Sequence, residues 1–329
     1  MRFIGRSNPR GHIADVARAG AGKFPPSAAG WTTLAQTEWV REGVIGNPRA
    51  DFVPIVDRAP LHLPDGHRVI ALLVVNVEQK QFDAPAGSPL GPNAPKLPEV
   101  PVFSKFEYGL RVGIWRMLEV TQRLEIPTSM TLNGSVGDFY PRVLDACVEA
   151  GWDAVAHGYF QDGLNEEEDE RPVIRQALDA IERQTGRRPM GWLGPGLHET
   201  FETPDVLADE GVRYVLDWVN DDQPYPMKVK SGRLTSVPYS NEINDIPIYI
   251  RGNHSSPEIV QRTQDALTTL LTDQPQTVRV LPIAVHPFIM GQPHRFPYFV
   301  KVLEHLKNQP GVVFMTATQI YEWYEGQVE

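Results

Sequence analysis

The feature that most constrains the fold is a continuous apolar run close to residue 70. The run, RVIALLVVNVE (68–78), is rich in β-branched residues, has the length of a strand and ends in polar residues. This pattern is typical of a strand that is buried on both faces of a parallel sheet. Apolar segments and amphipathic helices then alternate toward the end of the chain, in about seven strand–helix units. The alternation predicts a closed or nearly closed (β/α) barrel rather than an open sheet.

The first 66 residues have a different character. They are rich in Gly, Pro and Arg and show little periodicity, so we expect residues 1–66 to form an extended N-terminal arm. Residues 67–329 are then the barrel, which is the catalytic domain. A long Pro- and Gly-rich loop, from Asp83 to Pro101, follows the first strand. Loops of this length in a compact domain usually serve as lids, binding loops or interface segments.

The overall charge argues against some classes of partner. The chain has a formal net charge of −10 at pH 7, so neither nucleic acid nor an anionic membrane is an expected partner. Its single cysteine, Cys147, excludes an intrachain disulfide and a cysteine metal cluster. The N-terminus, MRFIGRSNPR, is polar, and no apolar run approaches the roughly 20 residues of a membrane helix. We therefore expect a cytoplasmic protein.

Polar or turn residues follow five of the expected strands. They are Asn76 and Glu78 after the first strand, His157 after DAVA, the turn around Trp192, Asp217 after VRYVL, and His286 after VLPIAV. A hydrophobic core needs none of these residues. The carboxyl ends of the strands meet at one end of a (β/α) barrel, where functional loops gather. A single histidine at a strand end is more often structural. The shared position of the polar residues after five strands, however, predicts one functional site.

The types of these residues suit hydrolysis by water. A carboxylate such as Glu78 can act as a general base, and a histidine can return a proton to a leaving nitrogen. The sequence has no Gly-x-Ser-x-Gly nucleophile motif, and Cys147 lies away from the strand ends. A covalent acyl-enzyme is therefore not expected.

Several segments together carry a family resemblance. They are YGLRVGIWRMLE (108–119), AHGY (156–159), RRPMGWLGPG (187–196), YVLDWVNDDQPY (214–225), VPYSNEINDI (237–246) and HPFIMGQPHR (286–295). In these segments the chain resembles the polysaccharide deacetylase (NodB-homology) family. It is most similar to the branch with the cofactor-independent allantoinases and the cytoplasmic peptidoglycan deacetylase-like enzymes. The resemblance implies a deformed (β/α)7-type barrel and spans roughly residues 65–325.

The chain departs from the family pattern at the metal site. Where family deacetylases typically carry two aspartates, this chain has Asn76, which cannot take up a proton, and Glu78. The family's His-x-x-x-His ligand pair is here His157 and Gln161, and a neutral amide is a poor Zn²⁺ ligand. Glu78 and His157 alone fall short of the three protein ligands usual at a catalytic zinc. The resemblance therefore implies no cofactor, or a weakly bound divalent metal such as Zn²⁺ on Glu78 and His157.

The predicted roles combine the strand-end positions with the resemblance. Glu78 is expected to activate water, His157 to position the water or a weak metal, and His286 to protonate the leaving nitrogen. The remaining residues are expected to contact the substrate. They are Asn76, Tyr108, Arg111, Gln161, Trp192 and Asp217.

These roles predict a hydrolase of non-peptide carbon–nitrogen bonds that acts on a small amide, ureide or cyclic amide. One alternative is a metal-dependent carbohydrate N- or O-deacetylase. Another is a non-catalytic barrel that binds a small ligand, an alternative that Asn76 and Gln161 keep open. Relatives with such N-terminal arms are often tetrameric, so the resemblance also implies a homo-oligomer, either a tetramer or a dimer.

Overall fold

The computed structural model describes residues 46–83, 97–164 and 169–328 of the chain. The chain divides into two compact units, residues 1–46 and residues 47–329, and the fold below is that of the second unit. Most of the predicted arm, residues 1–45, and most of the predicted loop, residues 84–96, lie outside the described residues.

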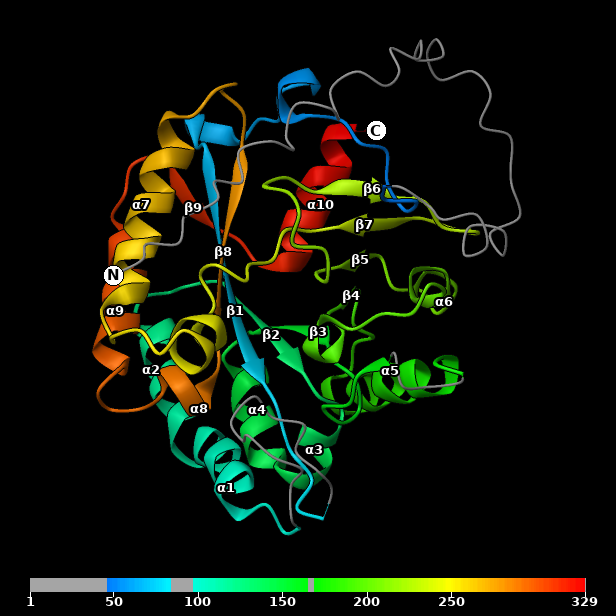
Figure 1. The fold of residues 1–329 in the computed structure, drawn as a ribbon, viewed down its shortest axis with the longest axis vertical. Helices are drawn as coiled ribbons and strands as arrows, with labels where there is room; N and C mark the ends of the chain where they lie inside the picture. Colours follow the sequence, from blue (N-terminus) through cyan, green and yellow to red (C-terminus); the bar gives the residue numbers. More distant parts are fainter. Residues whose placement is uncertain (1–45, 84–96, 165–168, 329) are drawn as a thin grey trace, which may run out of the picture. The chain divides into compact units, whose positions relative to one another are not determined.

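A curled sheet, in which β1 lies next to the end strand β8, forms the core (Figure 1). Strand β1 (Val69–Val77) is buried along its whole length, as the continuous apolar run predicted. It pairs in parallel with β8 (Arg279–Val285) along one side. On the other side it pairs with β9 (Val312–Phe314) at its start and with β2 (Thr128–Leu132) at its end.

The sheet continues from β2 toward one open edge. Strands β3 (Asp153–Ala156), β4 (Gly191–Trp192), β5 (Tyr214–Val215) and β7 (Leu234–Ser236) follow in parallel. The edge strand β6 (Tyr225–Met227) is antiparallel to β7 and was not predicted. Within the described residues no ladder joins this edge to β8. The barrel is therefore parallel but incompletely closed, which confirms the predicted deformed barrel.

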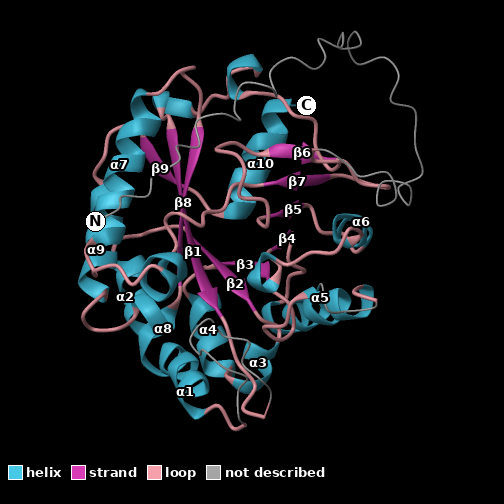
Figure 2. Ribbon diagram, viewed as in Figure 1, coloured by secondary structure: helices cyan, strands magenta, loops and turns pink. Residues whose placement is uncertain are grey.

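Helices surround the sheet (Figure 2). The helices are α1 (Val100–Tyr108), α2 (Ile114–Arg123), α3 (Ser135–Phe139), α4 (Pro141–Glu149), α5 (Arg171–Thr185), α6 (Thr203–Asp209), α7 (Glu258–Thr272), α8 (Pro287–Met290), α9 (Phe296–Lys307) and α10 (Ala317–Val328). The last helix begins with a capping box, because the Thr316 amide donates to Gln319 Oε1 and the Gln319 amide donates to Thr316 Oγ1. Helix α1 begins at Val100 and is followed by a π-helical turn over Gly109–Gly113.

Alternate residues of β1 face two different apolar clusters. Val69, Ala71, Leu73, Val75 and Val77 pack with residues of the surrounding helices. The residues between them pack inside the curled sheet, together with side chains of α10. Because side chains of a strand alternate between its faces, Asn76 and Glu78 continue the inner set. The alternation thus directs both polar side chains into the barrel.

The described part of the predicted arm packs on the barrel unit. Buried Arg49 forms an ion pair with Asp205 at 2.8 Å, and Arg58 forms one with Asp221 at 2.5 Å. The Leu61 amide donates to Thr277 Oγ1 at 2.9 Å. These contacts tie residues 47–66 to α6 and to the segments after β5 and before β8.

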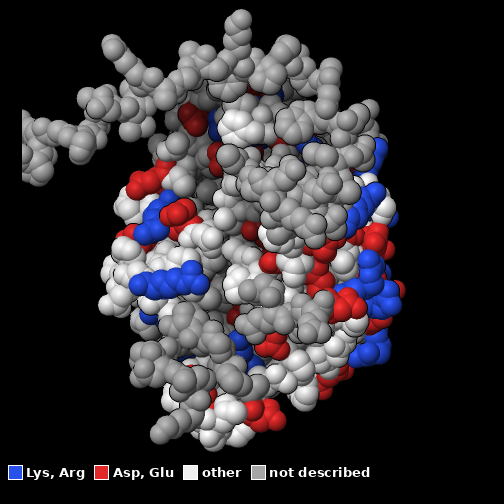
Figure 3. All heavy atoms as spheres, turned by 45° about the vertical axis from the view of Figure 1, so that its right-hand side comes forward, with Lys and Arg blue, Asp and Glu red and all other residues white. Residues whose placement is uncertain are grey.

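The outer surface carries both signs of charge. On the face that Figure 3 shows, basic and acidic side chains lie next to one another. Arg171, Arg175 and Arg188 of the α5 region, for example, form ion pairs with Asp209, Glu210 and Asp179. Among the described residues, no helix has both the length and the apolar character needed to cross a membrane.

Three glycines allow α8 to lie directly against the helix that precedes β2. A Cβ on Gly109 would lie 2.7 Å from the Phe288 amide nitrogen, and one on Gly113 would lie 2.0 Å from the Pro287 carbonyl oxygen. A Cβ on Gly291 would also lie 2.2 Å from that oxygen. This close backbone contact fixes the turn that follows His286.

We expect Gly113→Ala to destabilise the fold by about 1–3 kcal/mol or more, because the added methyl group overlaps the backbone of Pro287. The matched control is Gly326→Ala in α10, where an added Cβ meets nothing within 4 Å and should stabilise slightly. Denaturant unfolding followed by circular dichroism measures both. Equal stability of the two variants would show that the contact of α8 with the glycine turn is loose.

Candidate functional site

Glu78 is the centre of the site. Its Oε1 lies 2.9 Å from Gln161 Nε2 and 3.4 Å from both His157 Nε2 and His286 Nε2. The three catalytic candidates are buried, at 6%, 2% and 3% exposure for Glu78, His157 and His286. Every one of these contacts goes to Oε1, and Glu78 Oε2 makes no hydrogen bond to a described residue. Oε2 is the carboxylate oxygen available to a water molecule.

His157 is held in one orientation at the end of β3. Its amide donates to the Leu132 carbonyl at 3.0 Å, and its Nδ1 lies 2.6 Å from the Leu193 carbonyl oxygen. Because a carbonyl oxygen only accepts, Nδ1 is the donor in this contact. The lone pair of the neutral ring is then on Nε2, which faces Glu78 and Gln161.

The Gln161 amide occupies the space between Glu78 and His157. Its Nε2 donates to Glu78 Oε1 at 2.9 Å and to His157 Nε2 at 3.0 Å. Its Oε1 accepts a hydrogen bond from Asn133 Nδ2 at 3.0 Å, which fixes the amide orientation. Asn133 also donates to the carbonyl of His157 and was not among the predicted site residues. The amide thus presents two N–H donors to two acceptors.

His286 is held by a carboxylate that the sequence did not reveal. Asp245 Oδ1 lies 2.6 Å from His286 Nδ1, and Asp245 Oδ2 accepts the His286 amide at 2.7 Å. Asp245 is fully buried. With both carboxylate oxygens engaged, the ring is oriented with Nε2 toward Glu78. Phe288 packs edge-on against the ring, with centroids 5.3 Å apart.

Glu78 and His286 stabilise each other's charged form. Burial acts to raise the pKa of Glu78, but the charge of His286 and the hydrogen bond from this ring outweigh it and lower this pKa well below its usual range. Burial acts to lower the pKa of His286, but the charges of Asp245 and Glu78 raise it to about 10. At neutral pH the two groups are therefore a carboxylate and an imidazolium.

Asn76 links three strands beneath Glu78. Its Nδ2 donates to the Val285 carbonyl of β8 at 3.2 Å, and its Oδ1 accepts from Thr131 Oγ1 of β2 at 2.7 Å. Tyr239 also donates to Oδ1, at 3.3 Å. One N–H group and the carbonyl oxygen of the amide bind the protein, so Asn76 ties β1 to β2 and β8.

The side chains do not fit a catalytic metal ion. Within residues 46–83, 97–164 and 169–328, no three His, Cys, Asp or Glu side chains are arranged to hold one. The lone pairs of Glu78 Oε1 and His157 Nε2 both receive N–H groups from Gln161. A cation would have to displace these two N–H groups. The Gln161 amide oxygen that could then face the cation is a poor Zn²⁺ ligand.

We expect Gln161→His to create a metal site, because a second imidazole would replace the amide donors beside Glu78 and His157. The affinity of this variant for zinc, measured by competition with a chromophoric chelator, should be about 10²-fold or more above that of the unchanged protein. Gln261→His, which adds an imidazole on the exposed side of α7 and leaves the Gln161 donors in place, is the control. Equal zinc affinity of Gln161→His and the unchanged protein would mean that Gln161 does not block the metal position.

Two predicted substrate contacts lie outside the inner cluster of Glu78. Trp192 is fully buried and packs in the apolar cluster between the sheet and the helices. Asp217 accepts the Gly194 amide at 2.6 Å, and burial, followed by the charge of Glu199, raises its pKa well above the usual range. The structure therefore does not bring either side chain against Glu78.

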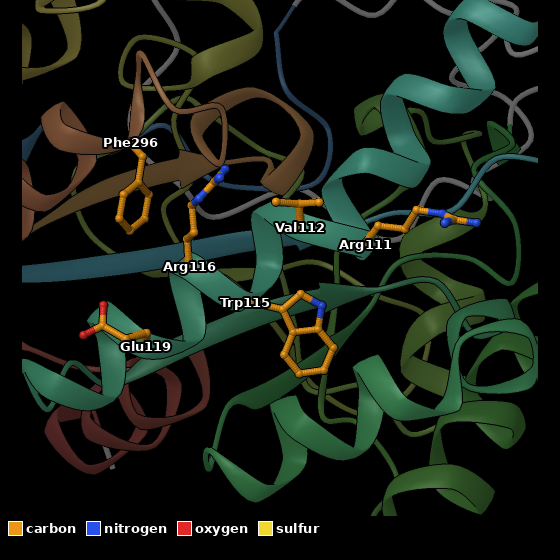
Figure 4. A pocket seen from close by; sticks show the side chains of 6 residues that line it. All are labelled: Arg111, Val112, Trp115, Arg116, Glu119 and Phe296. Atoms are coloured by element: carbon orange, nitrogen blue, oxygen red, sulfur yellow. The ribbon is translucent and has the colours of Figure 1, made fainter.

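Tyr108 and Arg111 lie around the π-helical turn before α2. Arg116 donates to Tyr108 Oη at 2.8 Å, whereas Arg111 is 71% exposed and pairs with Glu107 at 3.1 Å. Figure 4 shows Arg111 and Arg116 beside an open hollow on the outer helix surface, which Trp115 also lines. No contact of Tyr108 or Arg111 reaches the described atoms of the inner cluster.

The comparisons with known proteins agree with this fold. No family model matches the chain. A Schizosaccharomyces pombe protein assigned as a polysaccharide deacetylase is 27% identical, with 78% of this chain and 90% of that protein covered. The structure of the Puue allantoinase aligns with a TM-score of 0.73 at 22% identity and covers 84% of this chain and 98% of that one. A polysaccharide deacetylase structure from Pseudomonas aeruginosa aligns with a TM-score of 0.72 at 22% identity and covers 82% and 95%.

The matches confirm the resemblance to the polysaccharide deacetylase (NodB-homology) family. The structural matches also confirm the deformed (β/α) barrel. The names of these proteins, deacetylase and allantoinase, agree with the predicted class, a hydrolase of carbon–nitrogen bonds other than peptide bonds.

Proposed function

We propose that this chain hydrolyses a small amide, ureide or cyclic amide by direct attack of water, with Glu78 as the base and His286 as the acid. The observation that supports the proposal best is the chain of contacts Asp245–His286–Glu78–Gln161. It supplies an imidazolium and a carboxylate side by side, with an amide where a metal ligand would be needed. The names of the relatives, deacetylase and allantoinase, are those of hydrolases.

His286 suits the role of general acid. Its Nδ1–H is bound by Asp245 at 2.6 Å, which leaves Nε2–H to be transferred. Because the pKa of His286 is raised to about 10, the ring is protonated at the start of the reaction. As the carbon–nitrogen bond breaks, the Nε2 proton passes to the leaving nitrogen, and the departing group is a neutral amine or amide.

Glu78 gains basicity during the reaction. A carboxylate whose pKa is far below its usual range is a weak base, and the charge of His286 is the main cause of this lowering. When His286 gives its proton to the leaving nitrogen, that charge disappears and the pKa of Glu78 rises, so the carboxyl group then holds more firmly the proton that it took from water in the preceding attack. The water held at Glu78 Oε2 gives a proton to this oxygen as its own oxygen attacks the carbonyl carbon. After product release, the proton returns from Glu78 to His286, 3.4 Å away.

The proposal is tested by a substrate panel on the purified full chain. The panel contains allantoin, hydantoin, small linear amides and ureides, and N-acetylated chito-oligosaccharides, each assayed before and after treatment with EDTA. We expect turnover of an amide, ureide or cyclic amide that chelation leaves unchanged. Activity confined to acetylated sugars, lost with EDTA and restored by Zn²⁺, would favour the metal-dependent deacetylase. Saturable binding without any turnover would favour the non-catalytic barrel.

A further inference from the structure

Lys80 lies next to the site and has no role in the steps above. It follows Glu78 by two residues, just beyond the end of β1. Alternate residues of an extended chain share a face, so Asn76, Glu78 and Lys80 form one row that leads from the barrel interior to its mouth. The row places a cationic side chain beyond the carboxylate.

The ammonium group of Lys80 is held in place without a counterion. Lys80 Nζ donates to the Gln161 carbonyl oxygen at 3.1 Å and lies 5.6 Å from the centroid of the Phe106 ring. Phe106 packs in turn on Phe288, with ring centroids 4.0 Å apart. Among the described residues no carboxylate lies within ion-pair distance of Lys80. The charge of Glu78, followed by those of Asp162 and Glu99, acts on Lys80 without an ion pair.

This arrangement leaves hydrogen-bond donors free. An ammonium group has three N–H donors, and the described residues accept one of them, at the Gln161 carbonyl. Holding a half-buried cation without a carboxylate partner is unfavourable. The contact with the Gln161 backbone also fixes how far Lys80 Nζ lies from Glu78, because the Gln161 side chain binds Glu78 and His157.

The reaction needs a positive group at this position. Attack of water on the carbonyl carbon moves the π electron pair onto the carbonyl oxygen, and the resulting oxyanion must be stabilised. His286 is committed to the leaving nitrogen, and the N–H groups of Gln161 are bound to Glu78 and His157. In the described part of the site, Lys80 is the side chain that has both a positive charge and free donors.

We propose that Lys80 is a further catalytic residue, whose ammonium group donates a hydrogen bond to the oxyanion of the tetrahedral intermediate. The proton stays on Lys80 throughout, and the oxyanion collapses to the carbonyl as the carbon–nitrogen bond breaks. This inference rests on the proposed hydrolysis by Glu78 and His286.

The test is the kinetics of Lys80→Ala on the best substrate of the panel. Loss of one oxyanion donor should lower kcat by about 10²–10³-fold while KM changes little. Ethylammonium added to the assay should restore activity by about tenfold or more, because it supplies the missing N–H donor. Tetramethylammonium, which has the charge but no donor, should not. Lys301→Ala is the matched control, since Lys301 also lies over an aromatic ring, at 5.1 Å from Tyr298, but on α9.

Two results would overturn the assignment. One is a Lys80→Ala variant with the kcat of the unchanged protein. The other is a loss of kcat that ethylammonium does not rescue, which would mean that Lys80 only anchors the Gln161 backbone. A failure of the proposed function itself would give a different result. In that case Glu78→Gln would retain activity, or the unchanged protein would turn over no member of the panel.

Discussion

Glu78→Gln is expected to lower kcat by about 10²–10⁴-fold with the fold intact. Glutamine has nearly the same shape and can keep an oxygen toward the N–H groups that now meet at Oε1. It cannot accept a proton from water at Oε2. It also removes the negative charge that helps to keep His286 protonated, so the acid is weakened together with the base. Steady-state kinetics on the best substrate of the panel measure the loss.

The control for this variant is Glu182→Gln on α5, where the carboxylate pairs with Arg188 at the surface and is 49% exposed. It should leave kcat unchanged, since exposed pairs contribute only about 0–1 kcal/mol to stability. If Glu78→Gln kept kcat within about threefold of the unchanged protein, another group would have to activate the water. In that case Glu78 would serve only to hold the imidazolium of His286.

Sequence patterns predicted the part of the site that lies on strands. Glu78, His157 and His286 follow long or well-bounded apolar segments, and the structure brings both histidine rings to 3.4 Å from Glu78. The barrel followed from the same alternation. Trp192 is the last residue of β4, but this strand is only two residues long, so alternation could not show which face the side chain takes.

Residues outside regular strands could not be found in this way. Asp245 lies in an irregular segment whose only ladder contact is the bridge between Asn244 and Ala284. Such a segment has no periodicity, and nothing local marks Asp245 as the partner of His286, which lies 41 positions later in the chain. Strand β6 was missed because YPM contains a proline, which is tolerated at a sheet edge but is not a strand signal. The row of Asn76, Glu78 and Lys80 could have been found from alternation alone.

Asp245→Asn is expected to lower kcat by about 10²–10⁴-fold and to change its pH dependence. Asp245 accepts both the ring Nδ1–H and the backbone amide of His286. An asparagine can accept only one of these, and its NH₂ group then faces the other nitrogen as a donor. The charge of Asp245 is the first of the interactions that raise the pKa of His286 to about 10, against the lowering effect of burial. Without this charge the imidazolium loses its proton at a lower pH.

The pH profile separates this role from a purely structural one. In the unchanged protein, activity should persist until the pH approaches about 10, where His286 loses its proton, and in Asp245→Asn the alkaline limb should move toward neutral pH. Stability follows the same titration. A histidine whose pKa is raised by folding adds stability that is complete below its unfolded pKa of about 6.5 and is lost as the pH rises through the folded value. The stability difference between the two proteins should therefore be largest in mild acid and shrink as the pH rises.

The matched control is Asp179→Asn, which removes an exposed carboxylate paired with Arg188 on α5 and should leave both profiles in place. An alkaline limb that stays fixed in Asp245→Asn, with kcat lowered at every pH, would mean that Asp245 orients the ring without raising its pKa. An unchanged kcat would remove His286 from the acid role, since a general acid that loses its charged partner cannot keep the same proton affinity. The positive charge of His286 between the buried carboxylates of Asp245 and Glu78 is thus the feature of the proposed mechanism that the pH profile of one variant can contradict.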